Sequence, residues 1–182
     1  IRDKAFDEKE QMIEHLPKEL LKYVLLSFYY AFESIDYMKM AKILGQLEPY
    51  IDTDPDAKLI YDEGMERQIY TYERKWEEIK NQDIEEKSFF RYQVASFNYK
   101  AGNIERVISF LESFDDLGYP EKVILADALS DNKLYQEAFK YYCELIKEKT
   151  SQRIIINALS CLISAEKYAE AWAFKEKFSK FV

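Results

Sequence analysis

Two short stretches, LYQEAFKYY at residues 134–142 and KYAEAWAFK at residues 167–175, decide the fold of this chain. The second residue of each is a tyrosine, Tyr135 or Tyr168, and an alanine follows three places later. The two tyrosines lie 33 residues apart, and so do the two alanines. A period of about 34 residues with this spacing is typical of helix–turn–helix repeats. The C-terminal half of the chain is therefore predicted to be a series of helical hairpins.

The period continues toward the N-terminus in a weaker form. Ile104 and Val107 occupy the same two places 31 residues before Tyr135, and Tyr37 lies 67 residues before Ile104, close to two further periods. Isolated hairpins of this kind cannot bury their apolar faces, whereas stacked hairpins share a continuous core. We therefore expect an all-α fold, an α-solenoid of antiparallel helical hairpins with about nine to eleven helices.

The composition of the 182 residues suits such a fold. The chain is 48% apolar, enough for a sizeable core, and contains only four glycines and four prolines, too few for a β-rich or loop-rich protein. The net charge is −8, and no run of lysines or arginines occurs. Because nucleic-acid binding relies on a basic patch that neutralises phosphates, we expect no direct contact with nucleic acid.

The sequence carries few groups for catalysis or metal binding. His15 is the one histidine, and Cys143 and Cys161 lack the close spacing of a zinc-binding pair. No glycine-rich phosphate loop and no G-x-S-x-G motif occurs. We therefore predict a protein that is not an enzyme and uses no metal and no cofactor.

The cysteines and the hydropathy of the sequence also indicate where in the cell the protein is expected to be located. Cys143 and Cys161 both lie in apolar helical stretches, as expected of buried free thiols in a reducing environment. The longest apolar stretch, YVLLSFYYAF, has ten residues, half of the roughly 20 that span a bilayer. We expect a cytoplasmic protein without membrane insertion. Since the chain begins with Ile1 rather than Met, we also expect a fragment of a longer protein.

Turn residues and apolar periodicity divide the chain into two continuous parts. Residues 1–82 are predicted to form N-terminal helical hairpins and a long helix, starting with a polar helix over 4–15. Residues 83–182 are predicted to form three repeats, with Ser151 as a candidate helix cap. The expected helices of these repeats cover residues 88–103, 104–114, 121–132, 134–149, 151–165 and 168–181.

The stretch between these hairpins and the repeats has a clear start. Asp54 can cap a helix, and Pro55 suits the first helical position. After it, only Gly64 interrupts a run of helix-forming residues up to Asp83. We expect either one helix of roughly 24 residues or two helices that meet near Gly64.

The last three units resemble the tetratricopeptide repeat (TPR) family. That family has a small residue late in the first helix, an aromatic at the start of the second helix, and a small residue three places later. The likeness covers residues 86–182, extends loosely to 18–50 and omits 54–82. It departs from the pattern at Val107, where a small residue is expected, and at Lys175, where a late aromatic is expected. The residues that carry it are Val94, Ala95, Gly102, Ile104, Val107, Ala126, Tyr135, Ala138, Tyr142, Ala158, Tyr168 and Ala171.

The resemblance implies that ligands contact the first helix of each hairpin, on its concave side. Asn157 has an amide that can both donate to and accept from a peptide backbone, and Arg153 or Lys100 could take an acidic group. The family's paired Lys and Asn residues for a terminal carboxylate are not all present. The residues expected to bind a peptide or partner are Tyr29, Phe89, Tyr92, Tyr99, Arg153 and Asn157, with Phe32, Ser96, Asp127, Asp131, Ile156 and Ser160 beside them.

Three functions follow from this interpretation. The first is a non-enzymatic adaptor or scaffold that binds a protein or peptide. The second is the ligand-sensing half of a bacterial regulator, because the aromatic repeats are similar to those of cytoplasmic peptide-pheromone receptors. The third is an oligomerisation or structural segment, in which Phe178, Phe181 and Val182 meet a second copy or other parts of a longer chain.

Overall fold

The computed structural model of the chain describes residues 17–34 and 36–181. This part is all-helical, without strands, and most of its helices pack against the next helix along the chain, as in an α-solenoid. The predicted fold class is thus confirmed, whereas the expected polar helix over 4–15, His15 and Val182 lie outside the described residues. The α-helices are α2 (Lys18–Glu33), α3 (Tyr37–Leu47), α4 (Pro55–Ile79), α5 (Lys87–Lys100), α6 (Ile104–Leu111), α7 (Tyr119–Asp131), α8 (Tyr135–Glu148), α9 (Gln152–Ser164) and α10 (Tyr168–Lys177).

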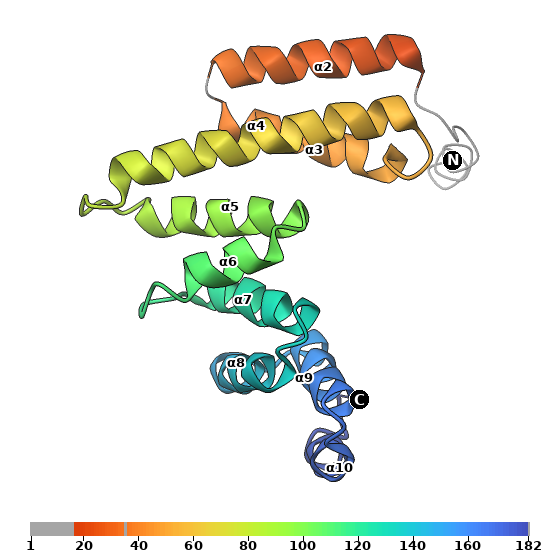
Figure 1. The fold of residues 1–182 in the computed structure, drawn as a ribbon, viewed down its shortest axis with the longest axis vertical. Coiled ribbons are helices and arrows are strands. Elements are labelled where there is room, and N and C mark those ends of the chain that lie inside the picture. The colour runs from red at the N-terminus through yellow and green to blue at the C-terminus, as the bar shows by residue number, and fades with distance from the viewer. Residues whose placement is uncertain (1–16, 35, 182) are drawn as a thin grey trace, which may run out of the picture. The chain divides into compact units, whose positions relative to one another are not determined.

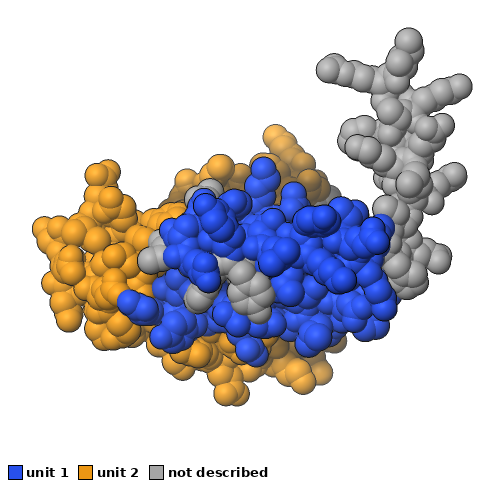
Figure 2. All heavy atoms as spheres, turned by 90° about the horizontal axis from the view of Figure 1, so that it is seen from above, with its two compact units in different colours: residues 1–74 blue, residues 75–182 orange. Residues whose placement is uncertain are grey.

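The chain divides into two compact units, residues 1–74 and 75–182, which Figure 2 colours blue and orange. The division falls within α4, so the last residues of that helix, from Lys75 on, belong to the second unit. The boundary predicted after residue 82 lies beyond the end of this helix.

The first unit contains the predicted N-terminal hairpin, in which α2 packs against α3. Asp36 caps α3, because its Oδ1 atom accepts a hydrogen bond from the backbone N–H of Lys39 at 3.0 Å. A short 3₁₀ turn, Glu48–Tyr50, follows α3. The apolar face of α3 has i, i+3, i+4, i+7 spacing, and all four of its residues are buried: Met40, Ile43, Leu44 and Leu47.

Helix α4 is one continuous helix of 25 residues, which decides between the two predicted arrangements. Asp54 caps it as expected, since Oδ1 accepts from the N–H groups of Asp56 and Ala57 at 2.9 and 3.1 Å. Gly64 lies inside the helix. A single interior glycine costs only about 1 kcal/mol and does not break a helix with a good cap.

The second unit is built from three hairpins, α5–α6, α7–α8 and α9–α10, which follow one another from green to blue in Figure 1. Their shared core includes Ala95, Ala126, Ala138 and Ala158, all fully buried. Small residues at these places let neighbouring helix backbones approach closely, which is why the alanines recur along the sequence. Ser151 precedes α9 with an extended backbone, but its side chain makes no capping hydrogen bond, so the expected cap was wrong.

The three hairpin turns have the same geometry. Gly102, Lys133 and Glu166 hold equivalent places, two residues before the second helix, with φ of +77°, +64° and +59°. In each turn the next residue donates its backbone N–H to a carbonyl five residues earlier, as from Leu134 to Leu129 at 2.8 Å. The repeat detected in the side-chain pattern is therefore also a repeat of backbone conformation.

Candidate functional site: a polar cleft and an aromatic cavity

A polar cleft of about 230 Å³ lies among the last two hairpins and the end of α5. Three of the six residues predicted to bind a partner, Tyr99, Arg153 and Asn157, line it together. They come from the first helices α5 and α9, and the first helix α7 lies between them in the chain. The remaining lining residues are Asp127, Ser130, Asp131, Tyr142 and Ser160.

Asp127 organises the cleft. The residue is only 8% exposed, and its carboxylate accepts three hydrogen bonds from two neighbouring helices. The Tyr142 hydroxyl donates to Oδ1 at 2.6 Å, Asn157 Nδ2 donates to Oδ1 at 3.2 Å, and Arg153 Nη2 donates to Oδ2 at 2.6 Å. The predicted peptide-binding groups of Arg153 and Asn157 are thus held in place by an acidic side chain of the same chain.

Asp131 forms the outer wall of the cleft. The hydroxyl of Tyr99 donates to its Oδ2 atom at 2.7 Å, which joins the first hairpin of this unit to the second. Burial, together with the hydrogen bond to this carboxylate, raises the pKa of Tyr99. The phenol therefore stays protonated and keeps donating at neutral pH.

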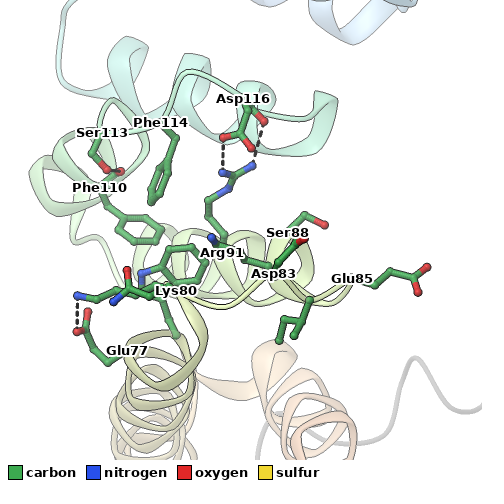
Figure 3. Close-up of a pocket in the computed structure, with 14 residues that line it drawn as sticks. Glu77, Lys80, Asp83, Glu85, Ser88, Arg91, Phe110, Ser113, Phe114 and Asp116 are labelled. Atoms are coloured by element: carbon green, nitrogen blue, oxygen red, sulfur yellow. Dashed lines mark hydrogen bonds and ion pairs between the residues drawn. The ribbon is translucent and has the colours of Figure 1, made fainter.

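An aromatic cavity of about 650 Å³, shown in Figure 3, lies where α4 ends, between the start of α5 and the end of α6. Trp76 meets Phe110 and Phe114 edge to face, with ring centroids 5.7 and 5.5 Å apart. Phe110 and Phe114 are themselves 5.3 Å apart at a steep angle. Such perpendicular contacts are favourable between aromatic rings, so the cluster is a preformed apolar wall.

Arg91 closes this cavity on the side of α7. It is 5% exposed, and its guanidinium lies 4.8 Å from the centre of the Phe114 ring. Nη1 donates to Asp116 Oδ1 at 2.7 Å, as Figure 3 shows, and Nη2 donates to the buried Glu121 at 3.0 Å. Burial alone would lower the pKa of Arg91, but the hydrogen bonds to Glu121 and Asp116 outweigh it and raise that pKa.

Charged side chains of both signs surround the mouth of the aromatic cavity. Lys80 forms an ion pair with Glu77 at 2.6 Å. Asp83 and Lys87 also line the cavity, and neither makes a side-chain ion pair with any residue that the structure describes. Glu85 points away from the rings in Figure 3. The cavity therefore combines an apolar wall with a mouth of nearly balanced charge.

One face of α5 connects the two sites. Ser88 lines the aromatic cavity and Tyr99 lines the polar cleft. Eleven residues separate them, close to three whole turns, so they lie on the same side of the helix about 16 Å apart. Tyr92 and Ser96, both half-buried, lie between them on the same side of the helix. Ser88, Tyr92, Ser96 and Tyr99 thus form one stripe along α5.

Of the other three of those six residues, Phe89 and Tyr92 line neither cavity. Tyr92 is half-buried and packs against the core, and Phe89 is exposed with its ring edge-on to Phe90 at a centroid distance of 5.3 Å. For Tyr29 the structure describes only the backbone, within α2. The sequence did not reveal the aromatic cavity, because Trp76 and Phe114 come from a helix end and a loop that follow no repeat spacing. Its residues that the sequence did not single out include Trp76, Arg91, Phe110 and Phe114.

Comparison with known proteins gives no further guide. No family model matches the chain, and neither does any curated protein or solved structure. Within residues 17–34 and 36–181, no helix is long and apolar enough to cross a membrane. The same residues hold no cluster of three or more His, Cys, Asp or Glu side chains arranged for a metal ion.

Proposed function

We propose that the chain is a protein- or peptide-binding module and acts as an adaptor or scaffold. The observation that carries this proposal is the polar cleft, in which side chains from three successive hairpins meet at one open site. A surface that draws on several hairpins suits a long ligand that contacts each of them in turn. The resemblance of residues 86–182 to tetratricopeptide repeats supports the same class of function.

The stripe along α5 indicates how such a ligand would lie. An extended segment rises about 3.3 Å per residue, so roughly five residues cover the distance from Ser88 to Tyr99. One end would place a bulky apolar side chain against Trp76 and Phe110 in the aromatic cavity. The other end would exchange hydrogen bonds with Asp131 and Asn157 in the polar cleft. Apolar anchoring would supply affinity, and the polar contacts would set the register.

The free thiols suit a reducing compartment such as the cytoplasm for this module. Cys161 is buried and Cys143 is half-buried, and burial raises the pKa of both thiols. Neither is therefore poised to react or to form a structural disulfide.

Selection from a displayed library of random peptides on the intact chain tests this proposal. A synthetic copy of each selected peptide is then titrated by fluorescence anisotropy against two obstructing variants, Ser96→Arg in the stripe and Ser160→Arg in the cleft. Because a bulky side chain fills the path of the ligand, each variant should weaken binding at least about tenfold. Gln136→Arg, on the exposed side of α8, is the matched control and should bind as the parent does.

Two results would overturn the proposal. One is a selection that returns no peptide with measurable affinity. The other is a set of peptides whose binding is indifferent to Ser96→Arg and Ser160→Arg, which would move the ligand away from the α5 stripe and the cleft.

A further inference from the structure

The side chains that line the polar cleft carry more negative than positive charge. Its charged lining residues are Asp127, Asp131 and Arg153. Arg153 is already paired, because its Nη2 atom donates to Asp127 Oδ2 at 2.6 Å. The only side-chain partner of Asp131 within the described residues is the neutral hydroxyl of Tyr99, at 2.7 Å. A ligand that enters the cleft therefore meets one carboxylate whose charge is not compensated.

The ion pair between Arg153 and Asp127 keeps the arginine in its place. The side chain of Asp127 is 10% exposed, whereas that of Arg153 is 66% exposed. Moving the guanidinium away would leave a buried carboxylate with only the neutral donors of Tyr142 and Asn157. Removing the charged partner of a buried carboxylate is strongly unfavourable. An acidic ligand could therefore not displace Asp127 from Arg153 at low cost, and it would also be repelled by Asp131.

The hydrogen-bonding positions that stay open in the cleft are mainly acceptors. Within residues 17–34 and 36–181, no donor reaches Oδ1 of Asp131 or Oδ1 of Asn157, and the hydroxyl of Ser160 makes no hydrogen bond. The cleft thus offers a carboxylate, an amide and a hydroxyl oxygen. A primary ammonium group has three donors and no acceptor, which matches this set in number and in kind. A guanidinium has five donors in a rigid fork, more than the set can satisfy.

The helical repeat does not account for the acidic residues of the cleft. Ser96, Asp127 and Ser160 hold equivalent places in α5, α7 and α9, at the spacings of 31 and 33 residues that also separate the hairpin turns. At the place of Asp131, the preceding hairpin has a basic residue, Lys100. Packing of the neighbouring hairpins therefore needs no acid at either place. Because a buried charge is costly to the fold, its presence here indicates a role in binding.

We propose that the polar cleft recognises a primary ammonium group of the bound peptide, either a lysine side chain or the N-terminal amine. The ammonium would lie against Asp131 and donate to the open oxygens of Asn157 and Ser160. This inference rests on the proposed function, since it assumes a peptide that lies along the α5 stripe. It adds the charge of the group that enters the cleft, about five residues from the apolar side chain in the aromatic cavity.

Chemical variants of the peptides selected from the displayed library test this charge. Each peptide is resynthesised with an acetylated N-terminus, with norleucine in place of every lysine, and with both changes. Norleucine keeps the aliphatic part of the lysine side chain and removes its ammonium. Affinity, measured by fluorescence anisotropy with the intact chain, should fall at least about tenfold in one of the two single forms. Loss on acetylation would assign the ammonium to the N-terminus, and loss on norleucine substitution would assign it to a lysine.

Two charge variants of the chain test the residue that receives the ammonium. Asp131→Asn removes the charge but keeps an oxygen that can accept from Tyr99. It should weaken the unmodified peptide at least about fivefold and have little effect on the form without an ammonium. Glu137→Gln removes the same charge from the exposed side of α8 and is the matched control, which should bind as the parent does. Both variants should keep the thermal unfolding midpoint of the parent, since Asp131 and Glu137 are exposed.

The outcomes separate this inference from the proposed function. Peptides that lose affinity with Ser160→Arg but bind equally well without any ammonium would overturn the inference and leave the proposed function standing. The same holds if affinity depends instead on an acidic residue or a C-terminal carboxylate of the peptide, tested by amide replacements, because the cleft would then bind an anion through Arg153. An equal response to Asp131→Asn and Glu137→Gln would also overturn it. A selection that yields no binding peptide would overturn both.

Discussion

The hydroxyl of Tyr142 donates a hydrogen bond to Oδ1 of Asp127 across 2.6 Å, inside the core that joins α7 to α8. Tyr142 is almost fully buried, and the Asp127 carboxylate, which is largely buried as well, is stabilised by such donors. Arg153 and Asn157 complete the set from α9. Tyr142, which the repeat pattern predicts to be a packing aromatic, therefore also holds the carboxylate at the base of the polar cleft.

Tyr142→Phe should destabilise the chain by about 1.5–3 kcal/mol, because it removes a hydrogen bond to a buried carboxylate while keeping the ring. Urea unfolding followed by circular dichroism measures the loss. Tyr141→Phe is the control, since the Tyr141 hydroxyl makes no hydrogen bond with any residue that the structure describes, and its stability should stay within about 0.5 kcal/mol of the parent. Equal stability of both variants would show that the bond to Asp127 contributes nothing.

Stability should fall at alkaline pH in a way that depends on Tyr142. Burial, and next the hydrogen bond to Asp127, raises the pKa of Tyr142 above the value of about 10 that it has in the unfolded chain. Above pH 10 the unfolded state loses this proton first, so the free energy of unfolding decreases as pH rises toward the folded pKa. Urea midpoints between about pH 9 and 11 should decline less steeply in Tyr142→Phe than in Tyr168→Phe, which removes an exposed hydroxyl. If the urea midpoints of the two variants declined equally steeply with pH, the loss of stability could not be assigned to the Tyr142 hydroxyl.

Arg91 and Glu121 should behave as a coupled pair. Arg91→Met leaves the buried Glu121 carboxylate with the N–H of Gly118 as its one partner among the residues that the structure describes, and should cost about 3–5 kcal/mol. Arg91→Met/Glu121→Met should cost clearly less than the two single changes added together, which a double-mutant cycle by urea unfolding measures. Lys122→Met, which breaks the surface pair with Glu148, is the control and should cost about 1 kcal/mol or less. Additive costs for Arg91 and Glu121 would mean that the pair is not coupled.

The hairpin turns predict opposite effects for two glycines. Gly102→Ala should destabilise by about 1 kcal/mol, because φ of +77° strains any residue with a Cβ although no atom lies within 4 Å of it. Gly45→Ala, inside α3 and equally unobstructed, should instead stabilise by about 0.5–1 kcal/mol. Lys133→Gly should also stabilise, since Lys133 holds the place of Gly102 in the next turn. Thermal unfolding of the three variants measures these shifts, and destabilisation by Lys133→Gly would refute the equivalence of the turns.

Much of the fold follows from local sequence alone. The spacing of Tyr135 and Ala138, the cap at Asp54 and the turn at Gly102 each act within a few residues, so helix limits and hairpin order could be predicted. Two kinds of local detail were wrong: α5, α6 and α10 end three or four residues before their predicted ends, and Ser151 does not cap α9. The cap depends on a side-chain rotamer that sequence does not specify. The candidate site was predictable only where it follows the repeat, as with Tyr99 and Asn157.

The sequence by itself determined that the chain is all-helical, where its hairpins turn and which residues recur at each period, because these are set by contacts a few residues apart. Only the tertiary structure decided that Asp127 holds Arg153 and Asn157 and that Arg91 pairs with Glu121. Those contacts join side chains about 30 residues apart. Their geometry arises from the way stacked helices bring distant turns side by side, which no local pattern encodes.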